Sequence, residues 1–306
     1  MTPSQDMAPV GLPHVVSGIE AAAAPIVNAL TIDVEDYFQV SAMAPYIRRD
    51  DWDARECRVE RNVERLLEML HRHGAKATFF TLGWIAERHP ALVRRIAAAG
   101  HEIASHGFGH ERVSDLSREA FVDDIVRAKR TLEDLVGQPV VGYRAPSFSI
   151  GEGNLWAFEC LQQTGHRYSS SIYPIRHDHY GMPDAPRFAH RVADGVIEIP
   201  ATTLRLFGHN LPSSGGGYFR LLPYRLSRWM IERVNRVDHE AAVFFLHPWE
   251  IDEDQPRVAG IDFKTRFRHY VNLGRTADRL DALLADFRWS RMDHVFLDPA
   301  PFAGHL

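Results

Sequence analysis

The sequence predicts an α/β fold in which parallel strands form a barrel surrounded by helices. Short apolar runs of strand length alternate with amphipathic segments of helical period over most of the 306 residues, a pattern typical of parallel strands joined by crossover helices. About seven such units predict a closed or nearly closed barrel, in which active sites lie at the carboxyl ends of the strands. An apolar content of 45% is sufficient for one large core.

The first half of the chain alternates four predicted strands with four predicted helices. Each strand is a short apolar run, and each helix repeats apolar residues every three or four positions. Gly74 and Gly100 are placed to end the first two helices, and Ser117 is placed to cap the third. The predicted strands are 29–34, 75–82, 101–105 and 140–143, and the predicted helices are 61–73, 84–99, 120–136 and 152–164.

The second half continues the alternation through segments 196–199, 223–237, 241–246 and 263–287. Residues 205–222 are the least regular part, because three successive glycines at 215–217 stand beside Tyr218. No linker composition divides the chain, so we expect a flexible tail at 1–25 followed by one domain at 26–306.

Composition excludes several classes of function. The net charge is −5, with 40 acidic and 35 basic residues interspersed, so neither nucleic acid nor an anionic membrane is an expected partner. The first residues have no basic region of a signal peptide, and no apolar run is long enough for a transmembrane helix. Cys57 and Cys160 lie far apart, so we expect free thiols in a soluble, cytoplasmic protein.

His106 and His110 form the most informative pair in the chain. They lie four residues apart after an apolar run, so both imidazoles can face one point and bind zinc or a similar divalent ion. The chain has 17 histidines, however, so such a pair also arises by chance.

Three acids lie at the end of the first predicted strand. Asp33 and Glu35 share one face of an extended strand, whereas Asp36 does not. Acids in this position also cap helices or lie in solvent. Later strands are followed by Arg144 and His247, so four strand ends deliver polar side chains to one edge.

These residue types fit metal-assisted hydrolysis. One carboxylate and two imidazoles make a three-ligand site with an open position, as in hydrolytic zinc centres. A second carboxylate can act as general base and His247 as general acid. Arg144 can orient the base, although a surface ion pair is its alternative explanation.

At this point the chain resembles the polysaccharide deacetylases of carbohydrate esterase family 4, which share the NodB homology domain. The resemblance extends from about Ala29 to Met292 and rests on four motifs in order. They are Thr31-Ile32-Asp33-Val34-Glu35-Asp36, His106-Gly107-Phe108-Gly109-His110, Arg144-Ala145-Pro146 and Leu246-His247. The resemblance implies a distorted (β/α)7 barrel that removes the acetyl group from an N-acetylated sugar, with one divalent metal ion, for which zinc is expected.

The resemblance also implies residue roles. Asp33 would accept the proton of the attacking water, His247 would protonate the departing amine, and a backbone N–H near Ser147 would stabilise the oxyanion. Pro146, Tyr218 and Trp249 would contact the substrate, with Tyr218 the preferred sugar platform.

Three departures from the family pattern bear on the site. Val34 separates the acids, so the metal ligand is Glu35 or Asp36, and strand alternation favours Glu35. Gly107 occupies the position of a serine or threonine that braces the histidine loop. Residues 168–171 replace an Asp-x-x-Asp element that tunes the catalytic histidine.

The motifs are most similar to those of deacetylases at exopolysaccharide loci of Gram-negative bacteria that contain exosortase, with a subgroup-specific segment from about residue 200. That subgroup is similar to a cytoplasmic, oligomeric branch that includes allantoinase-like enzymes. The function predicted is N-deacetylation of an exopolysaccharide or its precursor. The alternatives are hydrolysis of a small cyclic amide and carbohydrate binding without catalysis, although binding alone needs no acid, base or open metal position.

Overall fold

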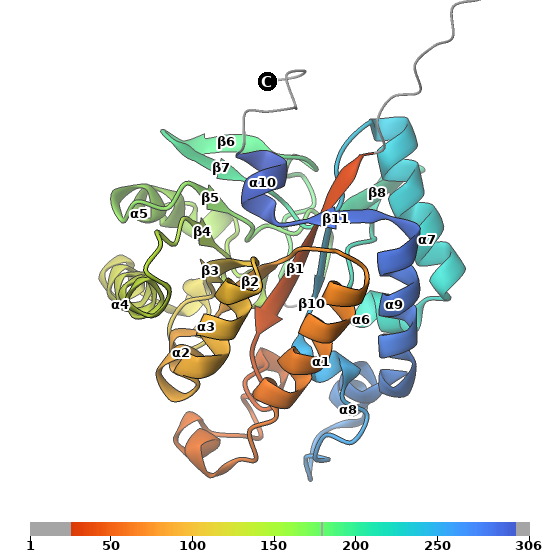
Figure 1. Ribbon diagram of the computed structural model, residues 1–306. Helices are drawn as coiled ribbons and strands as arrows, with labels where there is room; N and C mark the ends of the chain where they lie inside the picture. Colours follow the sequence, from red (N-terminus) through yellow and green to blue (C-terminus); the bar gives the residue numbers. More distant parts are fainter. Residues whose placement is uncertain (1–25, 179, 298–306) are drawn as a thin grey trace, which may run out of the picture.

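The computed structural model describes residues 26–178 and 180–297, and the predicted tail at 1–25 lies outside the described residues. Within these ranges the chain forms one curled, mainly parallel sheet with helices on its outer side (Figure 1). The prediction of a single α/β domain with a barrel-like sheet is therefore confirmed.

The main sheet has the strand order β10-β1-β2-β3-β4-β5-β7-β6, and β11 also pairs with β1. All of these pairs are parallel except β6 with β7. In chain order the strands are β1 Val27–Val34, β2 Thr78–Thr81, β3 Glu102–Ser105, β4 Gly142–Tyr143, β5 Tyr168–Ser169, β6 His190–Ala193, β7 Val196–Glu198, β10 Val243–Leu246 and β11 Arg288–Ser290.

The curled sheet does not close by a direct pairing of β7 with β10 in the described part of the chain. Instead, Ser214 and Gly215 lie beside β10. Gly215 forms a parallel bridge with Phe245, whose backbone N–H donates to the carbonyl of Ser214 at 2.6 Å. A Cβ on Gly215 would lie 1.9 Å from the Phe245 carbonyl oxygen, so this close approach requires glycine.

The helices follow the predicted order with local differences. They are α1 Val59–Arg72, α2 Gly83–Arg88, α3 Pro90–Ala98, α4 Arg118–Val136, α5 Ala157–Gln163, α6 Gly216–Leu221, α7 Tyr224–Arg233, α8 Phe263–Tyr270, α9 Thr276–Asp286 and α10 Met292–Phe296. None of the described helices is long and apolar enough to cross a membrane. Ser117 caps α4 as predicted, because its Oγ accepts the N–H of Ala120.

Three predicted elements were wrong. The segment 263–287 is divided into two helices, α8 and α9, by residues 271–275. The single helix at 84–99 is two helices, because Pro90 forces His89 out of helical geometry and then begins α3. The segment 205–222 is not irregular: it contains most of the hairpin formed by β8 Thr203–Leu206 and β9 His209–Pro212, followed by α6.

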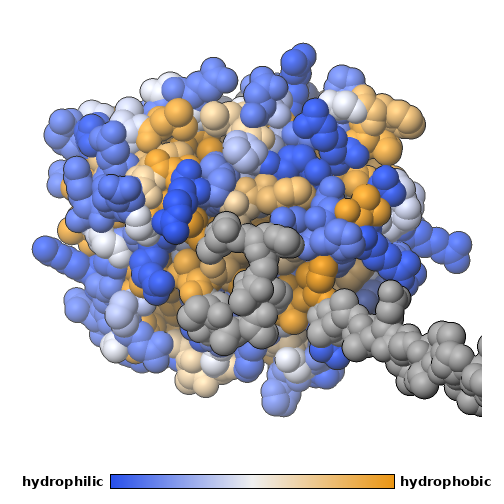
Figure 2. All heavy atoms as spheres, turned by 90° about the horizontal axis from the view of Figure 1, so that it is seen from above, coloured by the Kyte–Doolittle hydropathy of each residue, from blue (hydrophilic) through white to orange (hydrophobic). Residues whose placement is uncertain are grey.

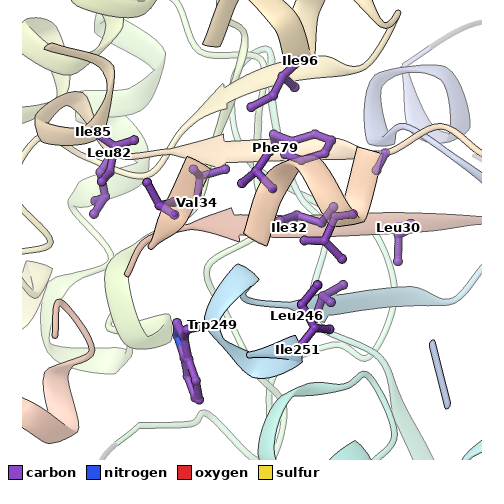
Figure 3. Packing of buried hydrophobic residues seen from close by; sticks show 14 of the residues in the cluster. Leu30, Ile32, Val34, Phe79, Leu82, Ile85, Ile96, Leu246, Trp249 and Ile251 are labelled. Atoms are coloured by element: carbon purple, nitrogen blue, oxygen red, sulfur yellow. The ribbon is translucent and has the colours of Figure 1, made fainter. Parts of the chain in front are cut away.

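The core shows how β1 positions the polar residues that follow it. Leu30, Ile32 and Val34 lie on one side of the strand and pack with the hydrophobic residues under the helices, including Phe79 and Leu246 (Figure 3). The intervening residues therefore face the interior of the curled sheet.

The surface at the amino ends of the strands is mainly hydrophilic, with separate apolar groups between charged ones (Figure 2). The carboxyl ends of the strands lie at the opposite end of the molecule (Figure 1).

Candidate active site

The polar residues predicted at the strand ends come together at the carboxyl edge of the sheet. Glu35 follows β1, His106 follows β3, Arg144 follows β4 and His247 follows β10. Since these strands are parallel neighbours, their carboxyl ends meet at one edge.

Glu35, His106 and His110 form a cluster with the geometry of a metal site. One ligand atom of each side chain lies within 4.8 Å of the others, and Glu35 Oε2 is 2.6 Å from His110 Nε2. All three side chains are buried or nearly so. Strand geometry therefore brings the predicted pair of imidazoles to the carboxylate of Glu35.

The hydrogen bonds of this cluster fit a divalent metal ion. The carboxylate of Glu35 is buried, with Oε2 beside His110 Nε2, and a buried carboxylate is costly unless a positive charge compensates it. His106 Nδ1 lies 2.9 Å from the carbonyl oxygen of Arg144, so Nδ1 carries the proton and Nε2 is left as a ligand. One carboxylate and two imidazoles are a donor set suited to zinc.

Asp36, the alternative ligand, has a different position. Its carboxylate accepts the backbone N–H groups of Tyr37, Arg58 and Val59 and so holds the start of α1. Burial raises the pKa of Asp36, although these hydrogen bonds oppose the shift. Asp36 thus has a capping geometry, and Glu35 is the acid that faces the histidines.

Asp33 and Arg144 form a buried ion pair beside the cluster, with Arg144 Nη1 2.7 Å from Asp33 Oδ1. Arg144 is fully buried, and its other donors bind Thr31 Oγ1 and both the carbonyl and hydroxyl oxygens of Ser170. The arginine is therefore fixed by contacts on several sides, and the alternative that it forms an ion pair at the surface is wrong. A guanidinium fixed in this way orients Asp33.

Residues 168–171, which replace the Asp-x-x-Asp element, hold Arg144 and not His247. Besides the two bonds from Ser170, Ser171 Oγ accepts the backbone N–H of Ala145 at 2.9 Å. The buried carboxylate of Glu198 accepts the N–H groups of Ser171 and Ile172, which anchors this segment.

His247 lies beside Asp33 and Glu35. Its Nε2 is 3.5 Å from Glu35 Oε1 and 3.8 Å from Asp33 Oδ2. Burial opposes protonation of His247, but the negative charges of Glu35, Glu250 and Asp33 outweigh it and raise its pKa to about 9.

Glu250 and Arg220 support His247 and were not predicted as site residues. Glu250 Oε1 is 2.7 Å from His247 Nδ1, and Glu250 Oε2 accepts from Arg220 Nε at 2.7 Å. Burial raises the pKa of Glu250, but Arg220 and His247 outweigh that effect and lower it to about 2. Glu250 lies three residues after His247, a local signal, but nothing in the sequence pairs either residue with Arg220.

The residues predicted to contact the substrate differ in their burial and in their contacts. Ser147 has φ +55° and hydrogen-bonds Ser41, Pro146 is buried, and Tyr218 is half-buried against an aromatic cluster. Trp249 corrects the prediction of a substrate contact: it is 4% exposed and stacked between His247 and His269, and its Nε1 donates to Glu35. A ring enclosed on both faces has no face open to a sugar, and it packs against His247 and Glu35 instead.

Two family models match the chain. Residues 46–168 match the polysaccharide deacetylases, and residues 170–297 match a domain of unknown function, DUF3473. A peptidoglycan-N-acetylglucosamine deacetylase of Bacillus cereus is 35% identical over 96 residues, which are 31% of this chain and 35% of that protein. The chain thus spans about a third of this relative.

Solved structures show the same fold. A candidate polysaccharide deacetylase from Mycobacterium smegmatis has a TM-score of 0.57 at 21% identity, covering 89% of this chain and 93% of that one. The PuuE allantoinase has a TM-score of 0.54 at 14% identity, with 87% of each chain covered. The family model supports the resemblance drawn from the motifs over residues 46–168, and the structural matches show the fold alone. The exopolysaccharide subgroup stays a prediction.

Proposed function

Because the chain carries a polysaccharide deacetylase domain at residues 46–168, we propose that it hydrolyses the N-acetyl group of N-acetylhexosamine units in an exopolysaccharide or its precursor. The observation that carries the proposal is the cluster of Glu35, His106 and His110 beside Asp33 and His247. Carbohydrate binding alone requires neither a fixed base nor a general acid next to a metal site.

We propose that Glu35, His106 and His110 hold zinc. Zinc in such a site supplies a Lewis acid for the acetyl carbonyl and makes water more acidic. Asp33, which Arg144 holds by its Oδ1, accepts the proton of the attacking water. His247 donates a proton from Nε2 to the leaving amine nitrogen, because its Nδ1 is committed to Glu250.

Ser147 lies in the loop after β4, which also carries Arg144. Its positive φ continues at Phe148, so two successive residues have left-handed backbone geometry. Successive peptide groups in such a turn can direct N–H donors at an anion. We propose the N–H near Ser147 as the donor to the oxyanion.

The exopolysaccharide substrate and cytoplasmic action are proposed from the motifs of the subgroup. The corresponding residues in this chain are Phe-Leu-His-Pro-Trp-Glu at 245–250 and Gly-Gly-Gly-Tyr-Phe-Arg at 215–220. Glu250 and Arg220, the last residues of these two motifs, form the ion pair behind His247, which gives both motifs a role in one site. We also propose that a segment specific to this subgroup begins at about residue 200 and that the protein self-associates.

Acetate release tests this function directly. Zinc-loaded protein would be incubated with N-acetylhexosamine polymers of different linkage, with zinc-stripped protein as control. We expect zinc-dependent acetate release from at least one polymer. If the protein binds zinc and polymer but releases no acetate, a binding function replaces the proposal, and hydrolysis of a small cyclic amide alone favours the allantoinase-like alternative.

A further inference from the structure

The loop that carries both histidine ligands lacks the side chain that would brace it locally. Gly107 follows His106 with φ +74°, a conformation that favours glycine. A Cβ at this position would lie 2.7 Å from Asp124 Oδ2. The space of a side chain at 107 is therefore occupied by the carboxylate of Asp124, which comes from α4.

Asp124 accepts hydrogen bonds from backbone N–H groups of this loop. Its two carboxylate oxygens lie 3.1 and 3.0 Å from the backbone nitrogen of Phe108, and the carboxylate also accepts the N–H of Gly109. Arg127, one turn further along α4, places its guanidinium 3.4 Å from the centre of the Phe108 ring. Both groups belong to the same helix, so α4 supports the whole segment between the histidines.

Other residues donate hydrogen bonds to the backbone carbonyls of the loop. The N–H groups of Gly83 and Trp84 at the start of α2 donate to the carbonyls of Gly107 and Phe108 at 3.0 and 2.9 Å, and Arg49 donates to the carbonyl of Gly109. The peptide groups between the ligands are thus held from two sides. Asp124 supplies the acceptor for the N–H groups.

We propose that Asp124 is a positioning residue for the metal site. Its carboxylate braces the loop between the two histidines, as a hydroxyl side chain at position 107 would. This inference rests on the metal site of the proposed function. His110 has φ +58°, which is unfavourable for a non-glycine residue and requires support from its surroundings. Without the carboxylate, the N–H groups of Phe108 and Gly109 lose their acceptor, and the loop can turn His110 away from Glu35.

Zinc affinity provides a test that is independent of catalysis. Stripped wild-type protein, Asp124→Ala and Asp124→Asn would each compete with a chromogenic chelator for zinc. Removing a group that orients metal ligands typically costs about 10- to 100-fold in affinity, so we expect a loss of that size for Asp124→Ala. Asparagine retains one oxygen acceptor without the charge, so its loss should be smaller.

Asp123→Ala is the matched control. Asp123 is the exposed neighbour of Asp124 on the same helix, and its substitution by alanine removes the same charge. We expect it to bind zinc like the wild type. Circular dichroism and thermal unfolding of the stripped proteins separate ligand positioning from general stability.

Equal zinc affinity of folded Asp124→Ala and wild type would overturn the inference, as would an equal loss in Asp123→Ala. If Asp124→Ala does not fold, Asp124→Asn decides: weaker zinc binding by a folded protein supports positioning, and unchanged binding overturns it. Zinc binding by a wild type that releases no acetate would contradict the proposed function and leave this inference standing. A wild type that binds no zinc would contradict both.

Discussion

Glu250 binds His247 at two points. The same carboxylate oxygen, Oε1, lies 2.7 Å from the ring Nδ1 and 3.0 Å from the backbone nitrogen of His247. A carboxylate can only accept, so Nδ1 carries a proton and the ring is fixed in one orientation. Nε2 consequently faces Asp33 and Glu35, where a proton can be delivered to the substrate.

Glu250→Gln should therefore move the alkaline limb of the pH profile of kcat to lower pH. The negative charge of Glu250 helps to raise the pKa of His247 to about 9 against the effect of burial. A general acid is active when protonated, so activity falls as pH rises through this pKa, and removing the charge brings the fall to lower pH. A cation bound to Glu35 also lowers the pKa of His247, so the alkaline limb of the wild type should lie below a pH of about 9. Asp254→Asn, a change at an exposed residue four positions further along the chain, is the control. Superimposable limbs for Glu250→Gln and wild type would refute this role.

Strand periodicity predicted the parts of the site that depend on local geometry. Alternation along 29–35 placed Asp33 and Glu35 on one face, and in the structure both face the interior while Leu30 and Ile32 pack in the core. The spacing of His106 and His110 predicted that their rings could converge, and one nitrogen of each lies near Glu35. These relationships involve residues a few positions apart, so sequence spacing determines them.

The contacts between distant elements could not be predicted in the same way. Arg220 meets Glu250 only because α6 folds against the turn after β10, and no periodicity encodes that contact. The hairpin of β8 and β9 was missed because its two-residue turn is Phe207-Gly208, both with positive φ. Asn-Gly or Asp-Gly is the usual signal for this turn, and phenylalanine in the first position conceals it.

Asp33→Asn should retain zinc and lose most acetate release. Asp33 is not among the three residues that converge as ligands, so zinc stoichiometry should stay that of the wild type. An amide cannot accept the proton of water at neutral pH, and loss of a general base typically costs about 100- to 10,000-fold in kcat. Zinc content and acetate release would be measured on the same preparation. An unchanged rate would show that another group is the base.

His106→Ala should lose the metal and, as a consequence, the activity. The histidine is buried, and its Nδ1 is committed to the carbonyl oxygen of Arg144, so only Nε2 is available as a ligand. Removing one of three ligands leaves Glu35 and His110, too few for tight binding of zinc. Zinc content after dialysis would measure the loss, with His209→Ala, an exposed histidine on β9, as control. Full zinc occupancy in His106→Ala would reject His106 as a ligand.

Glu198→Gln should reduce the decline in stability between acidic and neutral pH. Burial raises the pKa of Glu198 from 4.5 to about 7, although hydrogen bonds and the charge of Arg144 oppose the shift. The folded state then binds this proton more tightly than the unfolded state, so the free energy of unfolding falls as pH rises from about 4.5 to about 7. Glutamine lacks the titration but keeps an oxygen for the N–H groups of Ser171 and Ile172. Relative to wild type, the variant should therefore gain on the order of 1 to 3 kcal/mol across this window. Urea unfolding of metal-free protein at several pH values would measure the gain, with exposed Glu152→Gln as control. A difference between Glu198→Gln and wild type that stays constant with pH would show that Glu198 is ionised in the folded protein throughout this range.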